Sequence, residues 1–498
     1  MDFFLAIDAG TGSGKCVVFD AHGKLRARAA EEWTYEVTPD PELPSVKWFS
    51  FNPNAFWATL CRCIRAAVEQ AGAAPKDIAG IAATSQREAC VFVDHRGIEV
   101  YAGPNIDARG FREGMDVLQV FGAERLYRIT GHSAPFIFPL CRYLWYRKRS
   151  ESEVSRILMM NDWIHWRLTG EFVSEPSNAT ESMLFDVAGR TWAAQILEAF
   201  SIPRSLLPDI RQPGEQAGNL RADVAETLGL LPGTPVFVGG ADTQCSLLGA
   251  GVLDPGVVGA TLGTTTPVQA VTDELCLDPQ SSLWAGCHVV PDRWVLESNA
   301  GDTGDAYRWL IDLLRGDQPH EVARTQLEAA AAACPDTSAI LFVGPSVFDI
   351  QRIALRRPGG ILFPYPTLHV RPSAKELMRA FFESVGFALR ANLEQLERVL
   401  GTPPRRIVLS GGMTRNLALL RILADVLGRP LQVANEPESA ALGCAILMAS
   451  GGNLDKLRST AQSWVQHQTL EPAPNCERYA ARYETWRRLY EQFFDLEL

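Results

Sequence analysis

A chain of 498 residues is long enough for two or three domains, each able to bury a core. Its 47% hydrophobic and 21% charged residues are typical of a globular protein that folds in water, and no stretch reaches the apolar length of a membrane span. The net charge of −11 argues against a nucleic-acid partner, which would require a basic surface.

The cysteines and histidines indicate a reducing compartment and no metal cluster. The eleven cysteines lack Cys-x-x-Cys spacing, and their odd number favours free thiols. The N-terminus has no basic region and carries an acid at position 2, so no signal peptide is expected. The eight histidines are isolated, and residues such as His132 and His165 are expected to pack or to lie on the surface. We therefore expect a cytoplasmic protein.

The first predicted element is a β-hairpin with a long glycine-rich turn. One apolar run ends at Asp8, residues 9–15 read Ala-Gly-Thr-Gly-Ser-Gly-Lys, and a second apolar run follows from Cys16. Glycines let backbone N–H groups approach a phosphate, Lys15 could add a positive charge, and Asp8 could hold magnesium through water. Ala9 and Cys16 exclude a Walker A motif. An ordinary hairpin with a flexible turn is the alternative.

A predicted helix and strand lead to a polar turn. Asn52 and Pro53 have the residue types of a helix start, and Gly72 supplies the stop signal. Residues 78–84 then predict a buried strand, which ends in residues 85–88, Ser-Gln-Arg-Glu. Adjacent Arg and Glu suit the polar edge of a cleft, although a surface ion pair is the ordinary alternative.

Another strand end carries a single carboxylate. Residues 235–238 predict a short buried strand, and Gly239, Gly240, Ala241 and Asp242 follow it. Ligands in α/β proteins bind outside the carboxyl ends of strands, so this carboxylate is a candidate functional group. It could instead cap the following helix, and both roles are compatible.

A second loop is similar to the first. Residues 259–266, Gly-Ala-Thr-Leu-Gly-Thr-Thr-Thr, lie between apolar runs. Two hairpins rich in Gly and Thr, far apart in the chain, predict a duplicated architecture with one phosphate loop in each lobe.

The last part of the chain predicts helices around a further glycine pair. Residues 373–376, Ser-Ala-Lys-Glu, form a capping box that opens a helix through Leu400. A strand over 406–409 runs into residues 411–412, Gly-Gly, before a helix that ends at Gly428. This order permits close approach of a nucleotide.

Three further helices are expected. Residues 159–168 predict a helix that Gly170 ends, and residues 436–438 open a helix rich in small residues. The polar tail contains an amphipathic helix near 486–494.

In this order, the motifs resemble the FGGY carbohydrate kinases, which share the actin/hexokinase/Hsp70 ATPase fold. The resemblance covers about residues 4–450. It implies an α/β fold of two lobes, with duplicated mixed-sheet domains and a cleft between the lobes. It also implies a sugar-binding lobe over 1–247, an ATP-binding lobe over 248–452 and a helical extension over 453–498.

The resemblance further implies roles for individual residues. Asp242 would be the catalytic base. The substrate would be bound by Arg87, Glu88, Asn105, Asp107, Arg109, Asp242 and Thr243. ATP and its phosphates would be bound by Gly10, Thr11, Gly12, Ser13, Lys15, Gly263, Thr264, Thr265, Gly411, Gly412, Met413 and Asn416. Magnesium would be held by Asp8 and Asp242.

Motif details within the family favour the autoinducer-2 kinase branch. Residues 105–109, 161–163 and 176–179 resemble that branch. Xylulokinases and glycerol kinases usually carry Gly-Glu-Arg-x-Pro where this chain has residues 344–349, Gly-Pro-Ser-Val-Phe-Asp. Arg142 stands where a family signature usually has Lys. The implied acceptor is a linear ketose-like molecule, with xylulose, another ketopentose or a polyol as the alternative.

The implied reaction transfers the γ-phosphoryl group of ATP, with Mg²⁺, to a hydroxyl of a small sugar or polyol. The expected partners are that small molecule and ATP, and a homodimer is possible. The alternatives from other classes are an ATP-driven conformational protein and a non-catalytic sugar sensor of the same fold. The Arg/Glu pair and Asp242 favour the kinase, because neither alternative needs them both.

Overall fold

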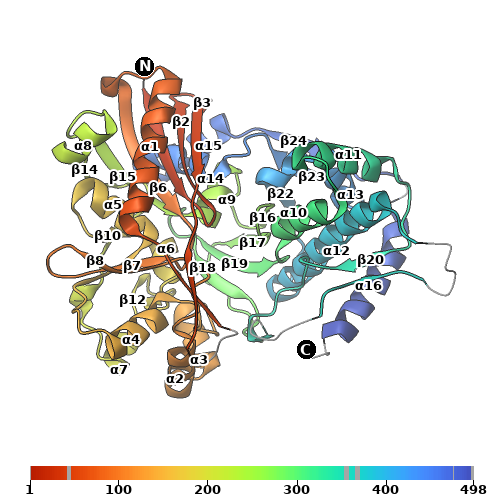
Figure 1. Cartoon of the computed structure of the whole chain (residues 1–498), viewed down its shortest axis with the longest axis horizontal. Helices are drawn as coiled ribbons and strands as arrows, with labels where there is room; N and C mark the ends of the chain where they lie inside the picture. Colours follow the sequence, from red (N-terminus) through yellow and green to blue (C-terminus); the bar gives the residue numbers. More distant parts are fainter. Residues whose placement is uncertain (1, 42–45, 353–357, 365–370, 475, 495–498) are drawn as a thin grey trace.

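The computed structural model describes residues 2–41, 46–352, 358–364, 371–474 and 476–494, which form two lobes (Figure 1). In Figure 1 the N-terminal half, red to yellow, forms the left lobe and most of the C-terminal half, green to blue, forms the right lobe. Each lobe is built on one large mixed β-sheet. This is the predicted two-lobed α/β architecture.

The sheet of the first lobe has six strands among the described residues, and the three central ones are parallel. The hairpin β1–β2 continues into β3, and β14 closes the other edge, all by antiparallel pairing. In spatial order the strands are β14 (Gln216–Asn219), β15 (Pro235–Ala241), β6 (Ile78–Ser85), β1 (Phe3–Ala9), β2 (Ser13–Asp20) and β3 (Leu25–Glu32).

The sheet of the second lobe repeats this arrangement, with one added strand at an edge. In spatial order its described strands are β18 (Trp284–Cys287), β19 (Trp294–Asn299), β17 (Pro267–Thr272), β16 (Val257–Thr261), β22 (Arg406–Ser410), β23 (Leu431–Ala434) and β24 (His467–Leu470). Apart from β18, the order and the directions match those of β3–β2–β1–β6–β15–β14. The duplicated architecture predicted from the two hairpins is therefore confirmed.

Local signals place several helices where the sequence predicts them. α1 (Pro53–Ala71) starts with the Asn52 side chain accepting from the N–H of Ala55 and ends at Gly72 in the left-handed region. α12 (Ala374–Leu400) has the predicted capping box, and both bonds between Ser373 and Glu376 form. These signals are readable because each lies within a few residues of the element it bounds.

The other described helices are α2 (Phe111–Phe121), α3 (Ala123–Thr130), α4 (Pro139–Arg149), α5 (Met160–Thr169), α6 (Pro176–Thr180), α7 (Ala194–Ala199), α8 (Ala222–Leu228), α10 (Thr303–Leu314), α11 (His320–Ala333), α13 (Leu417–Leu427), α15 (Leu454–Trp464) and α16 (Arg478–Phe494). The small strands are β4 (Glu36–Pro39), β5 (Lys47–Ser50), β7 (Cys90–Val93), β8 (Glu99–Gly103), β9 (Arg156–Met159), β10 (Val173–Ser174), β11 (Phe185–Asp186), β12 (Thr191–Trp192), β13 (Asp209–Ile210), β20 (Ile340–Phe342) and β21 (Gly360–Leu362).

Two helices cross between the lobes. They are α9 (Asp242–Gly249) and α14 (Ser439–Ser450), and glycines let their backbones touch. A Cβ atom on Gly443 would lie 2.1 Å from the carbonyl oxygen of Cys245, and one on Gly249 would lie 1.9 Å from that of Ser439. α14 also packs on β1, β6 and β15, so a helix from late in the chain covers one face of the first sheet.

The C-terminal tail is divided between the lobes: α15 packs with α14 in a core shared with the first sheet, and the tail from β24 onward belongs to the second lobe. β24 extends its sheet, and α16 begins at Arg478, well before the predicted 486–494. Trp486 of α16 is fully buried against Phe387 of α12. None of the helices that the structure describes is both long enough and apolar enough to cross a membrane. All eleven cysteines carry free thiols.

Candidate active site

Three parallel strands of the first lobe end at one edge of their sheet, where the predicted site residues follow. Ala9 of β1 lies opposite Ser85 of β6, which lies opposite Ala241 of β15. The first hairpin turn, the turn at 86–88 and Asp242 therefore start side by side. This agrees with the rule that ligands bind beyond the carboxyl ends of parallel strands.

The first phosphate loop is shorter than predicted. Only residues 10–12 form the turn, because β2 already begins at Ser13, which pairs with Glu32 of β3, and Lys15 pairs with Asp8 of β1. The turn is held from behind by Trp33, whose indole donates to the carbonyl of Thr11 at 3.1 Å. Gly12 is exposed, and a Cβ atom there would meet nothing within 4 Å. The turn is thus open on the side of Gly12 and supported by Trp33 on its other side.

Lys15 lies between two carboxylates. Its amino group is 3.0 Å from Asp8 and 3.6 Å from Glu438, which precedes α14. The pKa of Lys15 is raised, mainly by the charge of the Asp8 carboxylate. Lys15 is therefore a fixed cation beside the loop, and its contacts in this structure are with the protein itself.

The second phosphate loop is the turn between β16 and β17. Thr264 and Thr265 are exposed, and the N–H of Gly304 at the start of α10 donates to the carbonyl of Thr264 at 3.0 Å. A Cβ atom on Gly304 would lie 2.2 Å from the carbonyl oxygen of Gly263. The start of α10 thus supports this loop as Trp33 supports the first one.

The predicted adenosine-side residues adjoin this second loop. Gly411 has φ of 93°, and a Cβ atom there would lie 2.7 Å from the carbonyl oxygen of Leu262. The N–H of Met413 donates to the same carbonyl at 3.1 Å, and Gly412 is exposed and open. The side-chain oxygen of Asn416 caps α13 through the N–H of Leu419. The structure therefore places the predicted nucleotide residues of the second lobe next to one another.

The turn after β6 holds Glu88 in an unusual conformation. Glu88 has φ of 56°, which is uncommon for a residue with a side chain, and it is buried. Burial raises the pKa of Glu88. Strained backbone and a desolvated carboxylate occur together at functional sites more often than elsewhere.

Arg87 has buried carboxylate partners that the sequence analysis missed. Its guanidinium donates to both oxygens of Glu297, at 2.7 and 2.8 Å, and lies 3.4 Å from Glu181. Glu181 is also 3.4 Å from His132, whose pKa burial lowers to about 3, so this histidine is a neutral packed residue as expected. No local pattern marks Glu181 or Glu297, because they meet Arg87 from distant parts of the chain.

Asp242 is the first residue of α9, after Ala241 at the N-cap position. Its carboxylate is half-buried and accepts from the N–H of Thr243 at 2.7 Å, so Asp242 is not the helix cap that was the alternative. Burial raises its pKa to about 7; the Arg87 charge opposes this, and Asp8 and Glu88 add to it. A carboxylate tuned in this way is suited to accept a proton at neutral pH.

The predicted substrate residues after β8 have different surroundings from one another. The amide of Asn105 donates to the hydroxyl of Thr11 at 3.1 Å, which ties this segment to the first phosphate loop. The Asp107 carboxylate is fully buried and accepts from the N–H of Phe49 and from the hydroxyl of Tyr101, at 2.9 and 2.6 Å. Arg109 lies 2.6 Å from the same carboxylate. The contacts of Asp107 and Arg109 are with the chain itself, so we expect them to hold the segment rather than touch a substrate.

Arg142, noted only as a departure from the family signature, organises the same region. It is fully buried in α4 and donates to backbone carbonyls of both substrate-side turns. The acceptors are the carbonyl oxygens of Glu88, Gly103, Asn105, Asp107 and Ile137. A planar guanidinium with five N–H donors suits this number of acceptors.

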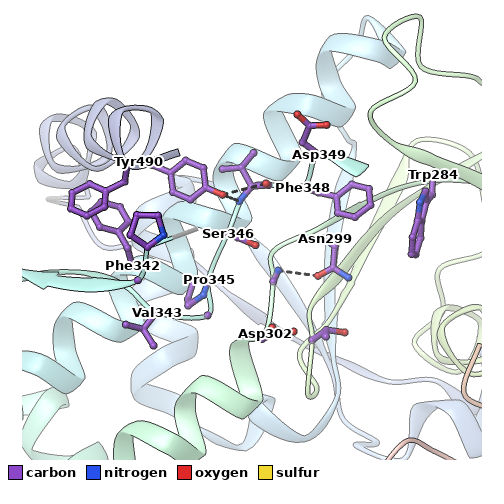
Figure 2. Close-up of a pocket in the computed structure, with 17 residues that line it drawn as sticks. Trp284, Asn299, Asp302, Phe342, Val343, Pro345, Ser346, Phe348, Asp349 and Tyr490 are labelled. Atoms are coloured by element: carbon purple, nitrogen blue, oxygen red, sulfur yellow. Dashed lines mark hydrogen bonds between the residues drawn. The ribbon is translucent and has the colours of Figure 1, made fainter. Parts of the chain in front are cut away.

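A cavity of about 560 Å³ lies in the second lobe between the second phosphate loop, the segment 344–349 and α16. Figure 2 shows Phe348 and Trp284 toward one end and Tyr490 and Phe342 toward the other. Thr265 also lines it, so the cavity borders the predicted phosphate site. The segment 344–349 thus forms one wall of this cavity.

The described residues contain no group of three or more His, Cys, Asp or Glu side chains that could hold a metal by themselves. Magnesium bound to a nucleotide needs only one or two carboxylates in addition to phosphates and water. The carboxylate of Asp8 at the end of β1 is a donor of this kind, and its charge reaches Asp242. These residues fit a nucleotide-bound magnesium ion.

The fold and the site together define a class of protein. Two lobes repeat one sheet order, each carries a hairpin turn of Gly and Thr, and a carboxylate stands beside an Arg and Glu pair at the sheet edge. This is the arrangement of sugar kinases with the actin/hexokinase-like ATPase fold.

Comparison with known proteins gives the family. Residues 3–249 match the N-terminal domain, and residues 258–451 the C-terminal domain, of the FGGY family of carbohydrate kinases. The chain belongs to this family, whose members use ATP as the phosphate donor, and it is a sugar kinase.

Similar proteins include kinases with different substrates. The autoinducer-2 kinase of Yersinia enterocolitica is 32% identical over 507 residues, which cover 98% of this chain and 94% of that protein. The crystal structure of xylulose kinase from Rhodospirillum rubrum superposes with a TM-score of 0.83 at 26% identity, covering 99% of this chain and 100% of that one. Plasmodium falciparum glycerol kinase with ADP gives 0.83 at 18% identity, covering 100% of this chain and 99% of that one, which supports the fold alone.

Proposed function

We propose that this sugar kinase phosphorylates a short linear ketose-like acceptor and that its preferred substrate is the open-chain precursor of autoinducer-2. The observation that carries the proposal is the end-to-end similarity to autoinducer-2 kinase, 32% over 98% of the chain. The segment 344–349 and the residues 105–109 support it, because both depart from the pattern of xylulokinases and glycerol kinases.

We assign the proton transfer to Asp242. As the acceptor oxygen bonds to the γ-phosphorus, the bond to the bridging oxygen breaks, ADP leaves with that electron pair, and Asp242 takes the hydroxyl proton. Its raised pKa and its place between Arg87, Glu88 and Asp8 support this role. Glu88 would accept from a substrate hydroxyl, and Arg87 would donate to one through the N–H groups that its carboxylate partners leave available.

The two turns would bind the phosphates through backbone N–H groups, and the surface formed by residues 411–416 would receive the adenosine. Of the two carboxylates predicted for magnesium, we assign Asp8 to the ion and Asp242 to the proton. When bound, the ion would supply charge neutralisation at the phosphates. Two lobes that close over the cleft would limit hydrolysis of ATP by water. The free thiols support a cytoplasmic site of action.

The acceptor is tested by measuring acceptor-dependent ADP production with the autoinducer-2 precursor, D-xylulose, glycerol and a buffer blank. We expect kcat/KM for the autoinducer-2 precursor to exceed that for xylulose by at least about tenfold, a difference of roughly 1.4 kcal/mol. The solved xylulose kinase at 26% identity makes xylulose the serious competitor. An advantage for xylulose or glycerol would reject the proposed substrate. ADP production that no acceptor stimulates would favour the conformational ATPase, and the absence of any ADP production would favour the non-catalytic sensor.

A further inference from the structure

One rung of the second lobe's sheet faces Arg87 of the first lobe. Gln269 of β17 and Trp284 of β18 both lie directly opposite Glu297 of β19, so the three side chains share one face of the sheet. Glu297 binds both terminal nitrogens of Arg87, and Gln269 donates to Glu297 at 2.7 Å. The Arg87 guanidinium lies over the Trp284 ring, 5.3 Å from its centre.

The pair between Arg87 and Glu297 is shielded from water and spans the lobes. Arg87 is 9% exposed and Glu297 is 2% exposed. The partner that Arg87 finds in its own lobe is Glu181, at the longer distance of 3.4 Å. The direction in which Arg87 points is therefore fixed mainly by the second lobe. A bidentate contact of this kind fixes geometry as well as charge.

The strands that carry this rung lead directly into the nucleotide side of the cleft. β17 begins at Pro267, directly after the loop 263–266. β19 ends at Asn299, shortly before α10, whose Gly304 donates to the carbonyl of Thr264 in that loop. A ligand that moves or orders the loop thus acts on the two strands that hold Glu297 and Gln269.

We propose that Glu297 is a positioning residue that completes the acceptor site from the second lobe and couples acceptor binding to nucleotide binding. It orients Arg87, which directly precedes Glu88 in the left-handed turn. The proposal rests on the proposed function, because it requires Arg87 and Glu88 to contact the acceptor. It adds that their geometry depends on the position of the other lobe.

The test measures the affinity of the autoinducer-2 precursor by calorimetry, with and without saturating MgADP. The ratio of the two dissociation constants is the coupling factor, expected to be at least about fivefold in the wild type. Glu297→Gln keeps the shape of the side chain and removes its charge. This variant should bring the coupling factor close to one and raise KM for the acceptor. Its affinity for MgADP in the absence of acceptor should stay within about twofold of the wild type.

Glu181→Gln is the matched control. It removes a buried carboxylate from the same arginine, but from within the first lobe, so the coupling factor should stay as in the wild type. Coupling that survives Glu297→Gln, or that falls equally in both variants, overturns the proposal. If Glu297→Gln does not fold, Glu297→Asp serves instead, because it keeps the negative charge on a shorter side chain. Glu297→Asp should lower the coupling factor partially, and an unchanged coupling factor in this variant also overturns the proposal.

Two further outcomes distinguish a failure of this proposal from a failure of the proposed function. If the wild type binds both ligands without coupling, the positioning role is wrong and the kinase assignment stands. If neither the autoinducer-2 precursor nor D-xylulose binds the wild type while MgADP does, the proposed acceptor class is wrong, and this proposal falls with it.

Discussion

Asp242 and its charged neighbours set the pH range in which the enzyme can work. Burial raises the pKa of Asp242 to about 7, with Asp8 and Glu88 adding to the shift and Arg87 opposing it. A base accepts a proton only when it is deprotonated, so kcat/KM for the acceptor should fall as the pH drops below about 7. A profile of kcat/KM over about pH 5 to 9 shows this acidic limb directly.

Asp242→Asn should fold like the wild type and should lose the decrease of kcat/KM at low pH. We expect kcat to fall about 10²–10⁴-fold, the usual contribution of a positioned base, with the affinity for MgADP nearly unchanged. Folding raises the pKa of Asp242 from 3.8 to about 7. The negative charge of Asp242 therefore destabilises the folded wild-type protein increasingly as the pH rises from about 4 to 7. The melting temperature of the variant relative to wild type should therefore increase over that range. Turnover close to wild type would remove Asp242 as the base.

Arg142 shows how a residue without substrate contact can shape a site. Its guanidinium donates to backbone carbonyls of the turns that carry Glu88 and Asn105. Arg142→Lys keeps the positive charge, but the lysine ammonium group cannot reach all of these carbonyls. Lys is nevertheless the residue usual at this position of the family signature. Each buried carbonyl left without a donor costs about 1–3 kcal/mol, so we expect a lower melting temperature and a higher KM for the acceptor.

Arg147→Lys on the same helix is the control for that variant. The Arg147 guanidinium is exposed and donates to the carbonyl of Phe200 at the surface, so its replacement should change neither quantity. Equal behaviour of the two variants would show that Arg142 does not position the substrate-side turns.

At the scale of elements, the two hairpin turns differ from the adjoining glycine loop in their tolerance of side chains. A Cβ atom on Gly10 would meet its nearest atom, the Ser13 carbonyl oxygen, at 3.7 Å, an ordinary contact. One on Gly411 would lie 2.7 Å from a carbonyl oxygen, in a backbone conformation that favours glycine. Gly10 is therefore a position where a Cβ atom fits the folded chain, so that added bulk there tests ligand binding.

Gly10→Val should weaken MgADP binding at least about tenfold, because the side chain would occupy the space that the phosphate needs beside the backbone. Gly10→Ala should have a smaller effect in the same direction. Calorimetry with MgADP, with melting curves of both variants to confirm folding, gives the result. Unchanged affinity in the valine variant would make this turn an ordinary hairpin.

The elements also show what the sequence can and cannot predict. Asn52, Gly72 and the Ser373 capping box act on neighbouring residues, so their patterns predicted α1 and the start of α12. The extent of the first turn was wrong, because Lys15 pairs with β1 and Ser13 pairs with β3, which draws both into β2. The pairing of Arg87 with Glu297 joins residues 210 positions apart, and only the assembled sheets bring them together.

At the scale of the whole molecule, the lobes are not two consecutive pieces of chain. α14, which lies late in the sequence, packs its Leu442 and Ala445 into a core that contains Ala6 and Ala82 of the first sheet. In return, the N–H of Ala285 in β18 donates to the carbonyl of Gly131 in the first lobe at 3.0 Å. The first lobe therefore depends on segments from the second half of the chain for part of its core.

We therefore predict that a fragment of residues 1–252 does not fold alone, although it contains every strand of the first sheet. Without α14 it exposes an apolar face of that sheet, so it should bind a hydrophobic dye and melt without a cooperative transition. The full chain should melt in a single transition. Joining residues 437–464 to the fragment by a flexible linker returns α14 and α15 and should restore part of the cooperativity. A sharp native-like melt of the unextended fragment would show that the first lobe is an independent folding unit and that α14 only adheres to it.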